Sequence, residues 1–359
     1  MILLRKILFP LAVLYGWITQ FRNFLFDTGV FKSYTFDLPV IAVGNLSVGG
    51  TGKTPQIEYL IRLLSPNYKI ATLSRGYKRK TSGFVLASES STAEDIGDEP
   101  LIYKTKYKVD VTVDGNRVNA VKKISAFDKV PNVILLDDAF QHRAIKCGLN
   151  IVVSDYSNLY FNDHMLPSGT LREFKSGINR ADVILISKTP ERTSPVEMRA
   201  ILKDIAPRAH QQVFFSYLRY GEIYSMTNNA EKIDTLNDLF RFRVISFAGI
   251  ANAQPMINYL KEYAAEVRHL EFPDHHDFML KDLEDIERYY NSFEGGNKIM
   301  VTTEKDFMRL KNKQTWDIAR RMNIYILPVE VTFKEKEEEF NELILKYVRT
   351  NRIYHQKYT

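Results

Sequence analysis

The sequence predicts an α/β fold with a mostly parallel sheet and helices on both faces, because short apolar β-branched runs alternate with helical stretches. With 359 residues the chain is long enough for two domains. Apolar residues make up 45% and charged residues 26%, a globular balance that excludes a disordered or collagen-like chain. We therefore expect an N-terminal helix over 1–28, a first domain over 29–205 and a second, smaller α/β domain over 206–359, with a possible linking ribbon near 211–226.

Charge and cysteine content narrow the functional classes. Lys and Arg number 49 and Asp and Glu number 43, which gives a formal net charge of +6. This modest excess suits an anionic ligand or a membrane surface, and we do not expect nucleic-acid binding from it. The single cysteine, Cys147, cannot form an internal disulfide, so we expect a reducing, cytoplasmic setting and no metal site built from several thiolates.

The N-terminal segment predicts a helix at a membrane surface. Residues 7–21 carry no charge, and they are short for a spanning helix, which needs about 20 apolar residues. On a helix the apolar side chains form one broad face, and Trp17 suits an anchor at headgroup level. We expect an amphipathic helix in the interface of one leaflet, with a helix packed on its own domain as the alternative. A secretory signal is not favoured, because the segment lacks an A-x-A-like cleavage site.

Residues 38–55 read as a buried strand, a glycine-rich turn and the start of a helix. A phosphate is bound by inward-pointing backbone N–H groups, and glycines allow the positive φ that such a loop requires. Lys53 would reach the β- and γ-phosphates, and the Thr54 hydroxyl would bind Mg²⁺. The pattern predicts a P-loop NTPase-like fold that uses ATP and Mg²⁺, although the general motif has glycine where this chain has Ser47. The expected nucleotide contacts are Ser47, Val48, Gly49, Gly50, Thr51, Gly52, Lys53 and Thr54.

Two aspartates end the next strongly apolar run, at residues 132–138. Because ligands of open parallel sheets lie at the carboxyl ends of strands, we expect Asp137 and Asp138 to face the phosphate loop and Mg²⁺. One of the two could instead cap the following helix. Gln141 and His142 follow within one turn and could contact the nucleotide or metal-bound water, while a purely structural histidine fits equally well.

Further polar residues lie near other strand ends. Arg75 follows an apolar run and could stabilise charge on a transferred phosphoryl group, with a surface arginine as the equal alternative. Asp98 and Glu99 lie in the string GDEP, where turn propensity alone is the simpler explanation. Arg172 and Glu173 lie in a loop with Pro and Gly. Lys188 ends a buried run, where related nucleotide folds place a lysine against the base, so its assignment is by analogy.

The string EFPDHHDF contains two adjacent histidines. Such side chains point in opposite directions on an extended segment, so His275 and His276 are not expected to share one metal ion. A single histidine beside a carboxylate base can orient that base or take up its proton. A surface loop with local aspartate–histidine pairing is the alternative.

Seven strings occur in a fixed order: VGNLSVGGTGKTP, SRGY, GDEP, DDAFQHR, LPSGTLRE, FPDHHDF and TTEKD. Together they resemble the tetraacyldisaccharide 4′-kinases of lipid A biosynthesis, over a stretch from the N-terminal helix to beyond residue 306. The resemblance implies a monomeric enzyme, peripheral to the cytoplasmic face of the bacterial inner membrane. Such an enzyme moves the γ-phosphate of ATP to the 4′-hydroxyl of a lipid disaccharide acceptor, tetraacyldisaccharide 1-phosphate, and yields lipid IVA.

The resemblance also assigns roles to residues. It implies Asp98 as the base that accepts the sugar hydroxyl proton, and His275 as the partner of that base. Ser47 is no departure within this family, whose loop is similar there. The implied catalytic set comprises Asp98, His275, Lys53, Arg75 and Arg172; the implied metal-facing set comprises Thr54, Glu99, Asp137, Asp138 and Glu173; Gln141, His142 and Lys188 join the nucleotide contacts.

Two other classes of function remain open from the sequence. One is a P-loop ATPase or GTPase that acts as a switch or assembly factor at the membrane and hydrolyses nucleotide without a sugar acceptor. Val48 argues against the subgroup of such proteins that carries an extra lysine just before its paired glycines. The other is a membrane-bound scaffold with a vestigial nucleotide site.

Overall fold

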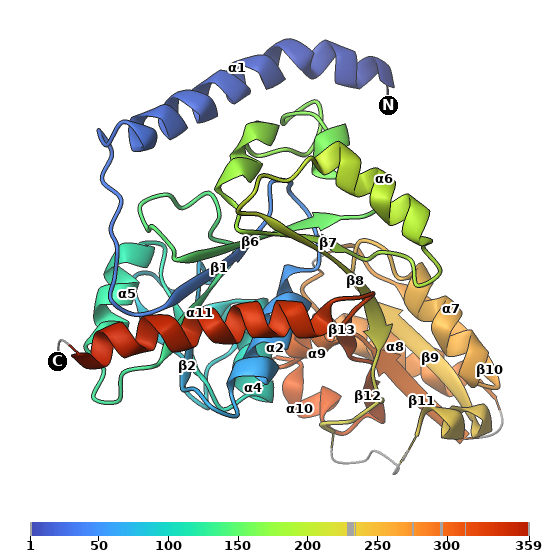
Figure 1. The fold of residues 1–359 in the computed structure, drawn as a ribbon. Coiled ribbons are helices and arrows are strands. Elements are labelled where there is room, and N and C mark those ends of the chain that lie inside the picture. Colours follow the sequence, from blue (N-terminus) through green and yellow to red (C-terminus); the bar gives the residue numbers. More distant parts are fainter. Residues whose placement is uncertain are drawn as a thin grey trace.

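The computed structural model describes residues 2–227, 233, 235–274, 276–294, 297–312 and 314–357. They form a nine-stranded sheet in the order β13-β8-β7-β6-β1-β5-β2-β4-β3 and a four-stranded sheet in the order β10-β9-β11-β12 (Figure 1). The predicted α/β class with a second, smaller α/β unit is confirmed.

The large sheet is parallel except at its two edges. Its central strands are buried on both faces, which explains why they read as continuous apolar runs and not as alternating patterns. The parallel strands are β1 (Val40–Gly44), β2 (Ile70–Ser74), β4 (Asp110–Val113), β5 (Val133–Asp137), β6 (Leu149–Asp155), β7 (Val183–Ser187) and β8 (Gln212–Tyr220). The antiparallel edge strands are β3 (Val85–Leu86) and β13 (Val329–Phe333).

Helices cover both faces of this sheet, as expected. One face packs against α2 (Lys53–Leu64), α4 (Asp98–Lys106) and α11 (Glu337–Lys357). The other face packs against α5 (Arg117–Ser125) and α6 (Pro195–Ile205). Shorter elements complete this unit: α3 (Ala93–Ile96), η1 (Tyr160–Asn162) and η2 (Lys175–Arg180).

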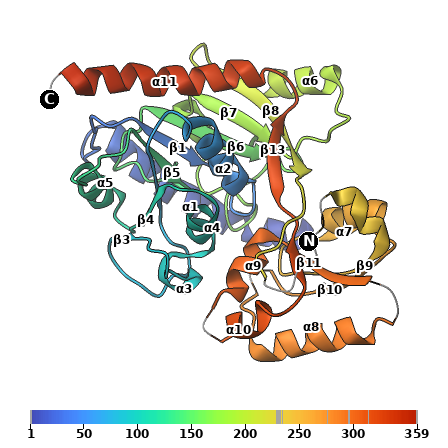
Figure 2. The same cartoon turned by 90° about the horizontal axis from the view of Figure 1, so that it is seen from below.

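The smaller unit is a parallel four-stranded sheet with its own helices (Figure 2). Its strands are β9 (Phe242–Ala248), β10 (Glu266–Glu271), β11 (Asn297–Thr302) and β12 (Ile324–Ile326). Its helices are η3 (Leu236–Arg241), α7 (Gln254–Tyr263), α8 (Leu280–Ser292), α9 (Glu304–Leu310) and α10 (Trp316–Ala319).

The chain returns to the large sheet after the smaller unit. Strand β8, which lies in the segment expected as a linking ribbon, pairs with β7, and β13 pairs with β8. The last helix, α11, then lies along the large sheet (Figure 1), and the Tyr347 hydroxyl bonds both the N–H and the carbonyl of Val40. The division at residue 206 therefore stays a prediction, and the strand pairing favours a smaller unit bounded by β8 and β13.

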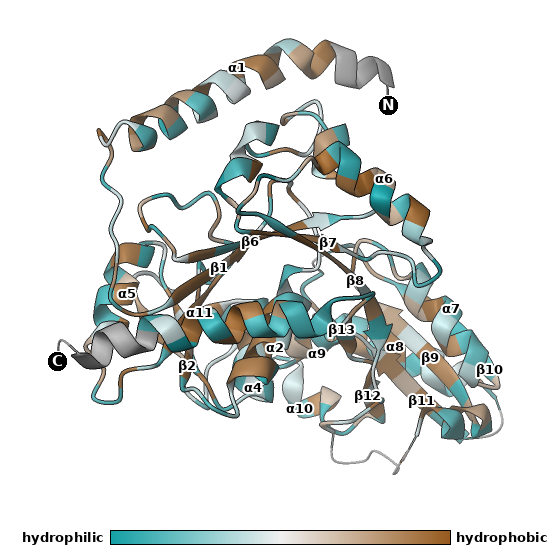
Figure 3. Cartoon of the chain, in the orientation of Figure 1, coloured by the Kyte–Doolittle hydropathy of each residue, from teal (hydrophilic) through white to brown (hydrophobic). Residues whose placement is uncertain are grey.

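The N-terminal helix α1 (Ile2–Asp27) packs on its own domain and also exposes apolar side chains. Ala12 is buried, and Gly16 lies so close to the Phe174 ring that an added Cβ would meet it at 2.6 Å. Trp17 and Phe21 are 66% and 62% exposed, and Figure 3 shows apolar residues recurring along the helix. Across the described ranges no helix is long and apolar enough to cross a membrane.

Candidate active site

The phosphate loop lies between β1 and α2, as the sequence predicted. Gly49 and Gly52 have φ of +106° and +88°, which is the left-handed region that glycine adopts without strain. Two buried hydrogen bonds hold the loop at Thr51. Asn45 Nδ2 donates to Thr51 Oγ1 at 3.0 Å, and Ser187 Oγ donates to the Thr51 carbonyl at 2.7 Å. Its shape is therefore set by the surrounding sheet.

Lys53, Asp138 and Arg172 form one charged cluster beside this loop. Lys53 Nζ lies 3.6 Å from Asp138 Oδ1, and Arg172 donates to Oδ1 and Oδ2 of the same carboxylate at 2.9 and 3.0 Å. Burial lowers the pKa of Lys53, and the charge of Asp138 opposes that shift. Three separate segments, after β1, after β5 and in the 165–173 loop, thus meet at one point.

Asp137 is buried behind this cluster. Tyr103 donates its hydroxyl to Asp137 Oδ2 at 3.1 Å. Burial, together with the charges of Glu99 and Asp138, raises the pKa of Asp137 to about 6, and the charge of Lys53 opposes this shift. A buried carboxyl with a raised pKa, next to a second carboxylate and near the start of α2, is chemically suited to a divalent cation.

Mg²⁺ usually binds one or two carboxylates together with waters and substrate phosphates, and it does not need a cage of protein ligands. Accordingly, the described residues contain no group of three or more His, Cys, Asp or Glu side chains arranged to hold a metal ion. Asp137, Asp138 and the buried Thr54 fit a site of this open kind.

Glu173 and Gln141 are engaged with neighbouring side chains. Glu173 is 1% exposed, and its two oxygens accept from Arg180 at 2.9 Å each. Asn23 of α1 donates to Glu173 Oε2, and Gln141 donates to Oε1 and to the Asn45 carbonyl. These contacts favour a role for Glu173 in tying α1 to the phosphate loop, and a metal role would require Arg180 to move away.

His142 lies among cationic side chains. Burial, together with the charges of Arg117, Arg22 and Arg75, lowers its pKa to about 4, so the imidazole is neutral near pH 7. Its Nε2 is buried without a hydrogen-bond partner in the described part of the chain. Arg75 itself is exposed.

Arg117 was missed by the sequence analysis. It is 5% exposed at the start of α5, and its charge interacts with Asp137, Asp138 and Arg75. Its burial lowers its pKa, an effect that the two aspartates oppose. A cation in the first turn of a helix interacts unfavourably with the helix dipole. An arginine at a predicted helix start was therefore the sequence feature that could have indicated a special role for Arg117.

Lys188 lies at the phosphate loop. Its backbone has a positive φ of 53°, and its Nζ donates to the Gly50 carbonyl and to Asp155 Oδ2. The structure thus places it beside the loop, and its contact with the nucleotide base stays a prediction.

The GDEP segment begins α4 and faces the smaller unit. Gly97 has a φ of +94°, which turns the chain into the helix. Arg309 Nε donates to Asp98 Oδ2 at 2.9 Å, and Lys305 Nζ donates to Glu99 Oε1 at 2.7 Å. Both cations come from α9, so α4 and α9 hold the two units together at this point (Figure 2).

Of the two histidines of EFPDHHDF, His276 lies among the described residues. His276 pairs through Nε2 with Asp282 Oδ2 at 3.0 Å, and its ring lies 4.9 and 5.0 Å from the rings of Phe272 and Phe278. His276 is thus engaged with the start of α8. His275, the expected partner of Asp98, lies outside the described residues.

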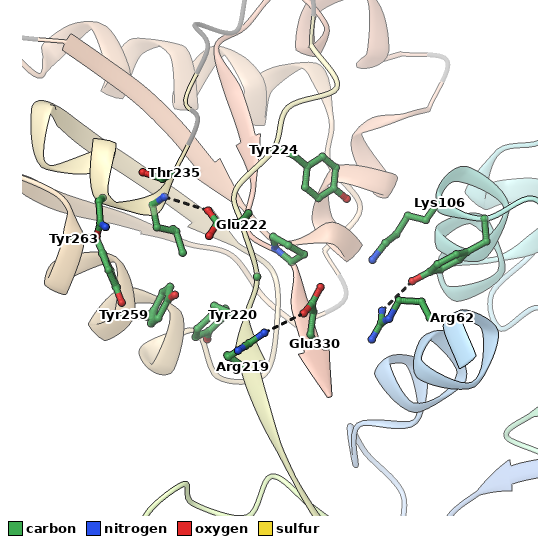
Figure 4. Close-up of a pocket in the computed structure, with 15 residues that line it drawn as sticks. Arg62, Lys106, Arg219, Tyr220, Glu222, Tyr224, Thr235, Tyr259, Tyr263 and Glu330 are labelled. Atoms are coloured by element: carbon green, nitrogen blue, oxygen red, sulfur yellow. Dashed lines mark hydrogen bonds and ion pairs between the residues drawn. The ribbon is translucent and has the colours of Figure 1, made fainter. Parts of the chain in front are cut away.

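A cavity of about 760 Å³ lies elsewhere between the units (Figure 4). It is lined on one side by Arg62 and Lys106, on the other by Tyr259 and Tyr263, and between them by residues near the ends of β8 and β13. Of the predicted site residues that the structure describes, none lines this cavity. It is therefore separate from the phosphate loop.

The glycine loop, the lysine at the start of α2 and the aspartates at the end of β5 define an ATP-dependent phosphotransferase of the P-loop class. A family model described as tetraacyldisaccharide-1-P 4′-kinase matches residues 4–349. The chain belongs to this family, and it is a kinase.

Relatives and a solved structure agree with this assignment. A tetraacyldisaccharide 4′-kinase of Flavobacterium johnsoniae is 49% identical over 351 residues, with 97% of this chain and 98% of that protein covered. The protein of the same name from Bacteroides thetaiotaomicron is 41% identical, with 97% and 94% covered. A crystal structure of LpxK from Aquifex aeolicus in complex with ATP has a TM-score of 0.74 at 31% identity, with 96% of this chain and 99% of that chain covered.

Proposed function

We propose that this protein transfers the γ-phosphate of ATP to the 4′-hydroxyl of a tetraacyldisaccharide 1-phosphate and so yields lipid IVA in lipid A biosynthesis. Membership of the kinase family and the likeness to an ATP complex support this function. The observation that carries it is the cluster of Lys53, Asp138 and Arg172 at the phosphate loop.

The phosphate side of the reaction is assigned to the large unit. Phosphoryl transfer depends on positioning and on neutralising charge, so Lys53 would bind the phosphates and Arg172 would stabilise charge on the transferred group. Thr54, Asp137 and Asp138 would hold Mg²⁺, which supplies further neutralisation of the phosphate oxygens when bound. Arg75 lies near Arg117 and His142, and we assign it to the positive charges that surround the phosphates.

The acceptor side is assigned to the GDEP segment. Asp98 would accept the proton of the sugar hydroxyl, as carboxylates do in general base catalysis. The Asp98 side chain is 22% exposed, so part of the carboxylate is accessible to an acceptor. His275 remains the proposed partner of this base.

The exposed apolar face of α1 supports contact with a membrane. Several large apolar side chains on it are more than half exposed, whereas the opposite side is tied down by Ala12, Gly16 and Asn23. A helix of this kind can lie in a bilayer surface while its domain stays outside. We propose that the enzyme acts as a peripheral monomer at the cytoplasmic face of the inner membrane, where its acceptor's acyl chains are buried.

Transfer of labelled γ-phosphate to tetraacyldisaccharide 1-phosphate in mixed micelles tests the function. We expect labelling of the lipid by the wild-type protein and by Lys203→Ala, an exposed control, and none by Lys53→Ala. Fast ATP hydrolysis that is independent of the lipid, without transfer, would instead favour a nucleotide switch.

A further inference from the structure

Three ion pairs connect α4 of the large unit with α9 of the smaller unit. Arg309 pairs with Asp98, Lys305 pairs with Glu99, and Lys106 pairs with Glu304. The residues of each pair are far apart in sequence, and the first pair is separated by 211 positions. The string TTEKD, which includes the start of α9, thus contributes to the same place as GDEP.

Arg309 is the most constrained member of this set. Its side chain is only 4% exposed, and its NH1 donates to Asp306 Oδ1 at 3.0 Å and to the Gly249 carbonyl at 3.1 Å. Asp306 is fully buried and is fixed in turn by Thr303, whose hydroxyl donates to Asp306 Oδ2 at 2.7 Å. Because NH1 is held on two acceptors, the guanidinium has little freedom when its Nε reaches Asp98.

The same arginine lies close to the EFPDHHDF segment. An added Cβ on Gly249 would meet the Pro273 carbonyl and His276 Cβ at 3.0 Å each, and Asp306 Oδ1 at 3.2 Å. The backbone of Gly249 is therefore sandwiched between that segment and the residues that hold Arg309. Three of the strings singled out in the sequence, GDEP, EFPDHHDF and TTEKD, converge here.

Asp98 uses one oxygen in this arrangement. Arg309 occupies Oδ2, while within the described residues Oδ1 has no hydrogen-bond partner. A bond to an arginine whose own position is fixed sets the orientation of the carboxylate plane. Oδ1 is then the oxygen available to a sugar hydroxyl.

We propose that Arg309 is a positioning residue for phosphoryl transfer, because it fixes Oδ2 of Asp98 from the smaller unit and leaves Oδ1 for the acceptor. This inference rests on the proposed role of Asp98 as the base. The smaller unit thereby orients the acceptor side of a site whose phosphate loop belongs to the large unit. Lys305 supports the arrangement by holding the adjacent Glu99.

Two substitutions distinguish the positioning role of Arg309 from the effect of its positive charge. Arg309→Met removes both, so we expect kcat to fall about 100-fold, the loss that a misplaced reacting group typically causes. KM for the lipid should change much less than kcat, because the acceptor still binds while the base is no longer oriented. Arg309→Lys keeps the charge but cannot reach Asp98, Asp306 and Gly249 together, so kcat should fall while the unfolding temperature stays close to that of the wild type.

The measurements are kcat and KM for lipid and ATP, with thermal unfolding. Arg320→Met is the matched control, because Arg320 is 41% exposed and pairs with Asp317, three residues earlier on the chain. KM for ATP should stay within about twofold in all variants, since Arg309 does not contact the phosphate loop. If Arg309→Met does not fold, the lysine variant decides, because it leaves Asp306 neutralised.

The outcomes distinguish this inference from the role of Asp98. Wild-type kcat in Arg309→Lys, or in a folded Arg309→Met, overturns the positioning role. A loss of kcat in Arg309→Met that is matched by weaker ATP binding and a lower unfolding temperature, and that Arg309→Lys does not share, also overturns it and indicates a structural residue. If Asp98→Asn alone keeps wild-type turnover, the base assignment itself fails.

Discussion

The phosphate loop is held by residues at the C-terminal ends of central strands in its own unit, whereas the GDEP carboxylates are held by a helix of the other unit. Asn45, Ser187 and Asp138 all belong to the unit that carries the loop. Asp98 and Glu99, in contrast, are held by Arg309 and Lys305. The side chains that hold the phosphate loop therefore come from one unit, although the charge of Lys305 on the other unit also acts on Lys53, while the acceptor side needs the interface between the two.

The strongest test of this division is Asp98→Asn. We expect turnover to fall about 1,000-fold, since a general base contributes between about 10² and 10⁴ in rate. Binding of ATP should stay unchanged because the phosphate loop is separate. Isothermal titration with a non-hydrolysable ATP analogue and a transfer assay would measure the two quantities, with the exposed Asp128→Asn as control. A parallel loss of ATP binding would show that the two sides are not independent.

The interface itself can be weakened at Lys106. Its ammonium lies between the carboxylates of Glu58 and Glu304, which are 2% and 8% exposed. Lys106→Met leaves two buried carboxylates unneutralised, so the free energy of unfolding should fall by about 3 kcal/mol. Urea unfolding measures this change.

Lys104→Met is the control for that experiment, because Lys104 lies on the same helix but pairs with Glu89, which is 93% exposed. An exposed pair contributes at most about 1 kcal/mol. Equal losses in the two variants would contradict a special role for the buried cluster.

The phosphate side can be tested through the pH dependence of the free energy of unfolding. The pKa of Asp137 is raised from its ordinary value to about 6, so between about pH 4 and pH 6 the native state holds a proton that the unfolded chain has lost. Stability therefore falls as the pH rises through this window. Asp137→Asn should remove this dependence and stabilise the metal-free protein by about 2–3 kcal/mol at pH 8.

Thermal unfolding at pH 4 and pH 8 without Mg²⁺ checks this expectation, and the same variant should bind Mg²⁺–ATP more weakly. A variant that is less stable than wild type at pH 8 would show that Asp137 is ionised and well compensated in the free protein.

The smallest expected effect concerns α1, which serves neither side directly. Trp17→Gln combined with Phe21→Gln removes apolar area that is already exposed, so the free energy of unfolding should change by less than about 0.5 kcal/mol. Affinity for anionic lipid vesicles should fall about tenfold or more, because less apolar surface enters the bilayer. Val196→Gln on α6, 67% exposed, is the control in vesicle sedimentation. Unchanged sedimentation would remove the membrane role of this face.

The sequence predicted best those features that local chemistry determines. The glycines, Lys53 and the aspartates after β5 were identifiable because a strand, a turn and a helix start are adjacent in the chain. The double-sided burial of the central strands likewise produced continuous apolar runs.

Features that depend on distant pairing were not predictable in this way. Arg309 reads as an ordinary helix residue until α9 is placed against α4, and Arg117 reads as a surface cation until its burial is known. Strand β13 also joins β8 only after the smaller unit has been inserted between them. Glu173 was assigned to the metal from its family position, and its pairing with Arg180 was invisible in the linear order.

The bond between Tyr347 and Val40 has a consequence for synthesis of the protein. The two residues are 307 positions apart, and the tyrosine hydroxyl serves both backbone groups of the first residue of β1. A ribosome must therefore make nearly the whole chain before the strand that leads into the phosphate loop reaches its final surroundings. Incomplete chains, from early termination or proteolysis of the C-terminal end, carry the nucleotide motif in a sheet that lacks its contact with α11.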